Sequence, residues 1–304
     1  MNLKPLRVRI GMTQKEMAEK LGTTQQTIAR WESGANAIPT KYLKDLAIAV
    51  GCSVADLLEI DETGRFKRRD DKDAGETEDD HLPYGAVRLA FDGEPQMYEA
   101  AEADKARSYE WPISQYAYSK LVERLRERSG WGGDDGNKGW LYFQTLNDRF
   151  VLVNPTCIDS VEFVSDDVEE TPGYEHLEVY ETINMILSNQ VPSDDQMDSD
   201  TAPISRRLLK KAKAVIHAWG GAEPAGIQMK DLIIEKKNGT RSSLSIEESN
   251  VNEIIYGLLD HPKSSADHRF GMLTSEDASA ATYFKFGSLR LLELSTLRWE
   301  SLDV

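Results

Sequence analysis

The sequence predicts a multidomain chain: an all-α head of five short helices, followed by a body of the α+β class built around antiparallel β-hairpins. Three observations support this. The 304 residues are too many for one average domain. Apolar residues make up 40% of the chain and charged residues 29%, as in globular proteins. Helical spacing of apolar residues in the first part gives way, after a highly charged stretch, to mixed strand and helix patterns.

We therefore divide the chain into four parts. The helical head spans 1–60, and a charged flexible linker spans 61–81. Two α+β subdomains follow at 82–190 and 204–304, the second for oligomerisation or sensing.

The helices of the head have recognisable start and stop signals. Thr13 and Glu16 have the spacing of a capping box, in which each side chain caps the backbone N–H of the other. Thr23 or Thr24 can cap the next helix, and Gly22 before them suits a left-handed turn. The pattern predicts two consecutive helices joined by a tight turn.

Turn residues between apolar runs predict three hairpins in the body. They are Gly139–Val153 around Asn147-Asp148, Asp231–Ile246 around Asn238-Gly239, and Tyr283–Leu294 around Gly287-Ser288. Asn238-Gly239 is typical of a type I′ turn, in which both residues have positive φ. A strand is expected at Thr156–Val164 and helices at Ile113–Arg128, Tyr174–Ser188, Ile204–Trp219 and Glu247–Leu259, with a break between subdomains at Gln190–Pro203.

Charge is distributed unevenly along the chain. Residues 1–60 carry eight Lys or Arg against six Asp or Glu, a net charge of +2. Residues 61–80 have a net charge of −4, and the remainder has 23 basic and 37 acidic residues. A mildly basic head on an acidic body indicates that the head is the part that meets a polyanion.

The segment Thr13–Glu32, TQKEMAEKLGTTQQTIARWE, has the features of two closely packed helices. Ala18 is small where the helices approach each other, Gly22 makes the turn, and Ile28 places the second helix in the core. With these features, Leu3–Leu58 resembles the Xre/Cro-type helix-turn-helix DNA-binding domain, and LGTTQQTIARWESG resembles the recognition segment of lambdoid phage repressors. The resemblance covers about the first fifth of the chain, and the C-terminal region resembles no family that we recognise.

The resemblance implies that the second helix of the pair enters the major groove of DNA. Thr24, Gln25 and Gln26 would then read bases, since a glutamine amide can pair with adenine and a threonine methyl can contact thymine. Arg30 replaces a neutral glutamine of the phage pattern and would contact either guanine or phosphate. Gln14 matches a glutamine that bonds phosphate and braces the first recognition glutamine. The expected DNA-backbone contacts are Arg7, Gln14, Thr27, Asn36, Lys41 and Lys44.

Other kinds of site find little support. The five histidines show no HExxH or paired spacing, and Cys52 and Cys157 are too far apart for a metal motif. No apolar run reaches the roughly 18 residues of a membrane span. We expect no metal, cofactor, catalytic residue or membrane contact. The basic residues from Arg206 to Lys213 are interpreted as a solvated helix face rather than a second DNA contact.

These observations predict a cytoplasmic, sequence-specific regulator of transcription that is not an enzyme. It would act as a repressor on a near-palindromic operator in double-stranded DNA, as a homodimer or higher even oligomer. Its acidic C-terminal region would serve oligomerisation or sensing of a small-molecule effector. The alternative is an antitoxin or protein-interaction regulator, whose C-terminal region binds a protein partner while the head represses its own operon.

Overall fold

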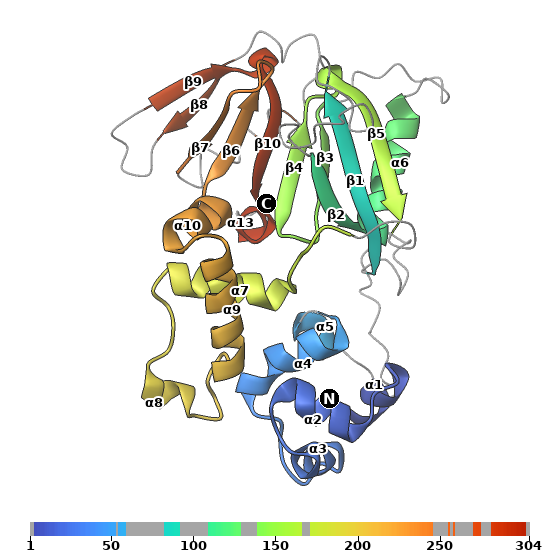
Figure 1. The fold of residues 1–304 in the computed structure, drawn as a ribbon, viewed down its shortest axis with the longest axis vertical. Coiled ribbons are helices and arrows are strands. Elements are labelled where there is room, and N and C mark those ends of the chain that lie inside the picture. Colours follow the sequence, from blue (N-terminus) through green and yellow to red (C-terminus); the bar gives the residue numbers. More distant parts are fainter. Residues whose placement is uncertain are drawn as a thin grey trace. The chain divides into compact units, whose positions relative to one another are not determined.

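The computed structural model divides into two compact units. Unit 1 comprises residues 1–78 and 175–225, and unit 2 comprises residues 79–174 and 226–304. The division differs from the predicted subdomains at 82–190 and 204–304, because residues 175–225 pack with the head (Figure 1). The residues that the structure describes are 3–52, 54–58, 82–91, 109–128, 139–165, 171–245, 255, 258, 270–274 and 281–301. The predicted linker at 61–81 lies outside them.

The first part of unit 1 is the helical head. Its elements are α1 (Leu3–Arg9), α2 (Gln14–Leu21), α3 (Gln25–Glu32), the 3-10 turn η1 (Thr40–Tyr42), α4 (Leu43–Val50) and α5 (Val54–Leu58). One side chain or more from each α-helix enters a common core, where Leu6, Met17, Ile28, Leu46 and Leu57 are at most 1% exposed. The core fixes which face each short helix turns to solvent.

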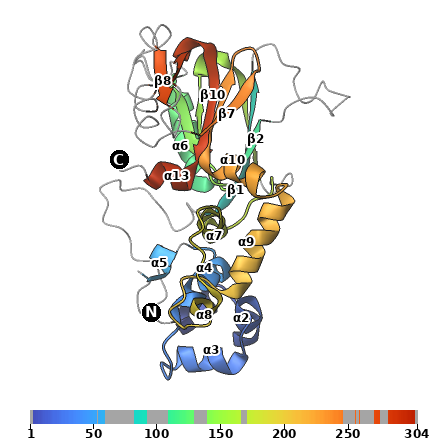
Figure 2. The same cartoon turned by 90° about the vertical axis from the view of Figure 1, so that its left-hand side faces the viewer.

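The second part of unit 1 is a helical segment whose elements are α7 (Leu177–Leu187), α8 (Asp194–Met197) and α9 (Arg206–Ala218). Helices α7 and α9 lie side by side (Figure 2). Each buries an apolar stripe, which includes Val179 and Ile183 of α7 and Leu208, Ala212 and Ile216 of α9. The stretch 190–203, predicted as a break between subdomains, instead connects two helices of one unit.

A buried carboxylate joins this segment to the head. The Glu178 side chain is only 2% exposed, and its two oxygens accept from Lys44 Nζ at 2.7 Å and from the backbone N–H of Val54 at 3.1 Å. Lys44 Nζ also pairs with Glu181. A buried carboxylate is tolerated only when charge and hydrogen bonds compensate it, and here the head supplies both.

Two further contacts hold α8 and α9 against the head. The Arg207 guanidinium donates to the carbonyl oxygens of Glu19, at 2.9 Å, and Lys20 at the end of α2. Lys41 Nζ lies 2.9 Å from the carboxylate of Asp200. The helices α7 to α9 are thus attached to α2, α4 and α5, and the head is part of a unit made from two distant stretches of sequence.

The described residues of unit 2 form three antiparallel sheets. The largest sheet has five strands in the order β3-β4-β10-β6-β7, with β10 at its centre. A smaller sheet has the order β2-β1-β5, and β8 pairs with β9 in the third. The elements are β1 (Pro83–Phe91), β2 (Glu110–Ser114), α6 (Gln115–Arg128), β3 (Leu141–Gln144), β4 (Arg149–Val153), η2 (Pro155–Cys157), β5 (Ile158–Ser165), α10 (Ala222–Lys230, which begins in unit 1), β6 (Leu232–Lys236), β7 (Arg241–Leu244), β8 (Phe270–Thr274), β9 (Ala281–Lys285), η3 (Phe286–Ser288), β10 (Leu289–Ser295) and α13 (Thr296–Ser301).

The larger sheet separates two apolar cores because successive side chains of a strand point to opposite faces. In β4, Phe150 and Leu152 enter a core with residues of β6 and β10, while Val151 and Val153 enter the other. This second core also contains Val87 of β1, and Ala117 and Leu121 of α6. With cores on both faces, β4 and β10 are buried along their entire length.

Two predicted hairpins are confirmed, with a correction to one turn. Strands β3 and β4 pair across Asn147-Asp148, and β6 and β7 pair across Asn238-Gly239. The type I′ prediction was wrong, because only Gly239 of that turn has a positive φ, at 78°. The Lys236 N–H donates to Thr240 O, which closes a three-residue loop whose last residue is left-handed.

The third predicted hairpin, Tyr283–Leu294, was wrong. Strand β9 pairs with β8, and the 3-10 turn η3 separates it from β10. Strand β10 pairs with β4 on one edge and with β6 on the other. Because both hydrogen-bonding edges of β10 are occupied, β9 cannot join it.

The helices predicted at 113–128, 174–188 and 204–219 are found as α6, α7 and α9, each slightly shorter than expected. The strand predicted at 156–164 is found as β5, after the 3-10 turn η2. The structure describes only Ile255 and Leu258 of the helix predicted at 247–259.

Replacement of Lys44 should show that the α7 contact stabilises unit 1. Lys44→Ala leaves the buried Glu178 carboxylate with only the Val54 N–H, so we expect a loss of roughly 2 kcal/mol in the free energy of unfolding. Urea denaturation followed by far-UV circular dichroism measures it. Lys15→Ala is the control, since Lys15 and its partner Glu19 are both exposed. Equal effects of the two variants would contradict the proposed contribution of the contact.

His176 should make unit 1 less stable in mild acid. It caps α7, where its Nδ1 accepts from the N–H of Glu178. Burial, and then the positive charge of Lys211, lower the pKa of His176 below its usual value. The unfolded chain therefore takes up this proton before the folded chain does, and stability is lost as pH falls below about 6.5.

The measurement is the free energy of unfolding between about pH 7.5 and 5.5, compared with that of His176→Asn. Asparagine keeps a capping oxygen but does not titrate. Burial raises the pKa of Asp45 and of Glu181, and these groups act in the opposite direction. The comparison between the two proteins is therefore decisive. The stability of the wild type relative to His176→Asn should fall as pH falls, and a difference that does not change with pH would contradict the prediction.

Candidate nucleic-acid interface

The turn between α2 and α3 is built by local capping. Thr13 and Glu16 form the predicted capping box at the start of α2. Gly22 ends α2 with a φ of 64°, in the left-handed region that favours glycine. The Thr24 side chain caps α3 by accepting from the N–H of Thr27 at 3.2 Å. Helix α3 therefore begins at Gln25.

The packing of α3 determines which of its side chains reach solvent. Ile28 and Trp31 are buried in the core of the head. Gln26 and Arg30 lie on the opposite side of the helix, Gln25 and the capping Thr24 stand at its N-terminal end, and all four are exposed. The four predicted base-reading residues are thus exposed at the start of α3 and along its polar side, and Ile28 and Trp31 anchor the helix in the core.

A buried carboxylate at the C-terminal end of α3 connects three helices. Glu32 accepts from Arg7 Nε of α1 at 2.6 Å and from Gln14 Nε2 of α2 at 2.7 Å. Burial alone would favour the neutral acid, but the hydrogen bonds from Arg7 and Gln14 outweigh it and lower the pKa of Glu32. The Arg7–Glu32–Gln14 cluster fixes α1 and α2 relative to the end of α3.

The residues predicted to contact the DNA backbone are placed in different settings. Asn36 is exposed in the loop after α3, and its N–H donates to Arg30 O at 3.3 Å. Thr27 is half-buried, with its hydroxyl 2.9 Å from that of Thr24. Gln14 donates to Glu32 and not to Gln25, so the expected bracing of the first recognition glutamine is absent from the described contacts.

The three predicted backbone cations are all engaged within unit 1. Arg7 pairs with Glu32, and it also donates to Met12 O at 2.6 Å. Lys41 pairs with Asp200. Lys44 is only 16% exposed between Glu178 and Glu181. Their positive charges thus have protein partners, and each side chain has a structural role that the sequence analysis did not assign.

Sequence reasoning missed the partners of these cations. Glu178, Glu181 and Asp200 lie more than 130 positions after Lys44 and Lys41, and no local signal connects the two stretches. Of the basic helix, Arg207 contacts the head, and Lys211 lies 2.6 Å from Glu175. All five basic residues of the helix are exposed, as expected, but Arg207 and Lys211 also have protein partners that the sequence analysis did not anticipate.

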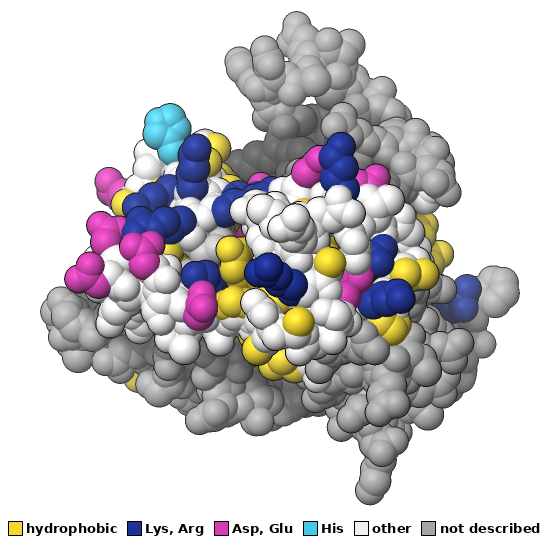
Figure 3. Space-filling view, turned by 90° about the horizontal axis from the view of Figure 1, so that it is seen from below, with side chains coloured by type: hydrophobic (Ala, Val, Ile, Leu, Met, Phe, Trp, Pro, Cys, Tyr) yellow, Lys and Arg dark blue, Asp and Glu magenta, His cyan; other side chains and the backbone are white. Residues whose placement is uncertain are grey.

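The surface around α3 carries mixed charge. Viewed from the α3 side, Lys and Arg side chains are spread over unit 1, and a group of Asp and Glu side chains lies toward one edge (Figure 3). Among the described helices, none is long and apolar enough to cross a membrane. The described residues also contain no group of three metal-ligating side chains.

Comparison with known proteins agrees with this geometry. Residues 3–57 match a helix-turn-helix family model, and the rest of the chain matches no family model. No solved structure matches the chain. A helix-turn-helix of this type implies binding to DNA and is typical of transcriptional regulators. Residues 3–57, with their capped α2 and α3, thus form an Xre/Cro-type helix-turn-helix domain.

Proposed function

We propose that the protein is a sequence-specific repressor of transcription, without enzymatic activity, that binds a near-palindromic operator as a dimer. The observation that carries the proposal is the exposed polar start of α3, where Thr24, Gln25 and Gln26 project from a helix packed on its other face by Ile28 and Trp31. In helix-turn-helix proteins, this end of the second helix reads base edges in the major groove.

The side chains on this face suit direct readout. A glutamine amide donates to adenine N7 and accepts from adenine N6, and a threonine methyl packs on the thymine methyl. Arg30 is exposed one turn further along α3 and can donate to guanine or to phosphate. We propose an operator half-site that opens with an A·T pair.

The placement of the backbone cations changes the proposed phosphate contacts. The ammonium of Lys44 is enclosed by two carboxylates, so we now assign it to attachment of α7. Arg30 on α3 and Asn36 in the loop after it remain exposed, and we prefer them as the residues that contact DNA phosphates. Two heads are then needed, because a head with a net charge of +2 makes few contacts with a polyanion. Linking two heads raises the avidity by ~10²–10⁴.

Base readout is tested by glutamine replacement. Gln25→Ala or Gln26→Ala should cost ~1–3 kcal/mol on an operator selected from random DNA, with little change on unrelated DNA. Fluorescence anisotropy at fixed salt measures both affinities. Gln190→Ala is the matched control, since Gln190 is an exposed glutamine of unit 1 outside α3. If neither Gln25→Ala nor Gln26→Ala weakens operator binding, α3 is not the reading helix.

Dimerisation is tested with the full chain, because a fragment that ends in the linker lacks the helices that hold Lys44 and Lys41. At micromolar concentration, light scattering should give twice the mass of one chain or a higher even multiple. The selected operator should contain two half-sites about 34 Å apart, one turn of DNA. A monomer that binds a single half-site with full affinity would exclude the dimer model.

A further inference from the structure

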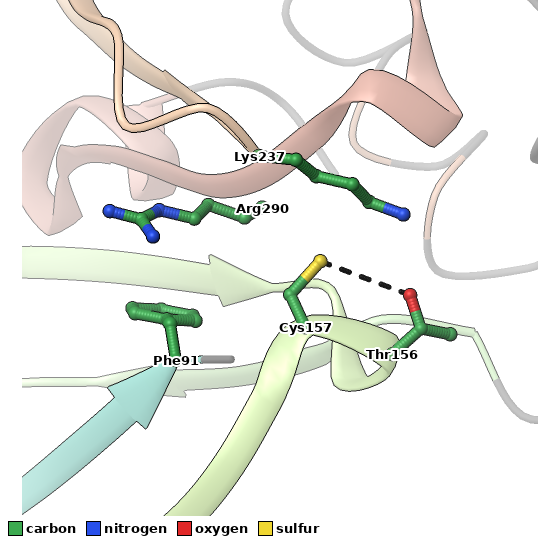
Figure 4. A pocket seen from close by; sticks show the side chains of 5 residues that line it. All are labelled: Phe91, Thr156, Cys157, Lys237 and Arg290. Carbon is green, nitrogen blue, oxygen red and sulfur yellow. Dashed lines mark hydrogen bonds between the residues drawn. The ribbon is translucent and has the colours of Figure 1, made fainter. Parts of the chain in front are cut away.

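We propose that unit 2 contains a binding site for a small organic anion, a carboxylate or a phosphate ester. The site is a cavity of about 190 Å³ between the end of β1, the turn η2, the start of β10 and the turn after β6 (Figure 4). Its lining residues are Phe91, Thr156, Cys157, Lys237 and Arg290. The volume equals that of roughly six liquid water molecules, so the cavity has room for the acid group and a few further atoms of a ligand.

The charge of the lining favours an anion. Lys237 and Arg290 are both cationic, and none of the lining residues that the structure describes is acidic. The surrounding sequence is strongly acidic, with 37 Asp or Glu against 23 Lys or Arg in residues 81–304. Since Glu235 balances the charge of Arg290, Lys237 gives the cavity a net positive charge, which attracts negatively charged ligands.

Arg290 forms a rigid wall of the cavity. Its side chain is 4% exposed, and Nε and Nη2 donate to Glu235 Oε1. Its Nη2 also donates to the Tyr109 hydroxyl, and the ring of Phe91 lies 4.6 Å from the guanidinium carbon. This geometry is set before any ligand arrives, so binding loses little side-chain entropy here.

Lys237 supplies the net charge, because Glu235 already balances Arg290. The Lys237 backbone N–H donates to Ser288 O at 2.9 Å, which fixes the residue at the edge of the cavity. Within the described part of the chain, its ammonium has no ion-pair partner. In Figure 4 its side chain extends past Cys157 toward Thr156. An anion near these side chains would gain a charge-assisted hydrogen bond from Lys237.

Thr156 adds selectivity for the group next to the anion. Its hydroxyl donates to Asn154 Oδ1 at 2.8 Å and therefore meets a ligand as an acceptor. Phe91 and the Cys157 thiol offer an apolar surface. The preferred ligand thus carries a hydroxyl or amine beside its acid group and a short apolar part, as in a hydroxy acid. The site does not depend on DNA binding; only its role as an effector site rests on the proposed function.

The experiment uses the full chain with Cys52→Ala, which leaves Cys157 as the sole thiol. The probes are acetate, lactate, glycerol 3-phosphate and inorganic phosphate, each titrated to about 10 mM, well above the Kd of a moderate site. We measure the rate at which iodoacetamide modifies Cys157, and isothermal titration calorimetry gives the Kd. At least one probe should slow the modification saturably. Lactate against acetate tests the hydroxyl preference, and glycerol 3-phosphate against phosphate tests the need for an organic part.

Two lysine variants locate the binding. Lys237→Gln should weaken the best probe about tenfold, equivalent to the loss of one charge-assisted contact. Lys236→Gln, an exposed neighbour outside the cavity lining, should leave the Kd unchanged. Equal weakening by both variants, or no saturable effect of any probe, overturns the proposal. None of these readouts involves DNA. The test of anion binding therefore gives its own result even if the protein does not bind an operator.

Discussion

The carboxylate of Glu178 is the constraint on which the organisation of unit 1 depends. It is buried in α7, and both of its partners, Lys44 and the N–H of Val54, belong to the head. If the two parts separated, a buried ion pair would be broken and each charge would have to be solvated again. This interaction, with the hydrogen bonds of Arg207 to the end of α2, makes residues 175–225 part of the DNA-binding unit.

Besides the chain through 61–81, the helix-turn-helix domain has a second link to unit 2, through its non-covalent contacts with the α7–α9 segment. The chain enters the α7–α9 segment from unit 2 at residue 175 and returns to unit 2 at residue 226. Helices of this segment contact α2, which packs against α3, and α4, which follows it in the chain.

Burial also explains which local signals misled the sequence analysis. Gly287-Ser288 looked like a hairpin turn, but β10 is buried on both faces and has both edges paired. Asn238-Gly239 gave the hairpin correctly and its turn type wrongly, because the Asn238 side chain accepts from the Thr240 N–H and supports a three-residue loop. Such choices depend on side-chain contacts and strand partners, which short-range patterns do not contain.

What the sequence alone determined is local. The caps Thr13 and Thr24, the turn Gly22 and the apolar positions of α2 and α3 act within one or two helical turns, so the helix pair and its exposed Gln25 and Gln26 follow from adjacent residues. Only the tertiary structure decided the roles of Lys41 and Lys44, and only it brought Lys237 and Arg290 to one cavity. The physical reason is that ion pairs and cavities depend on distance in space, and their members here are more than 50 residues apart in sequence.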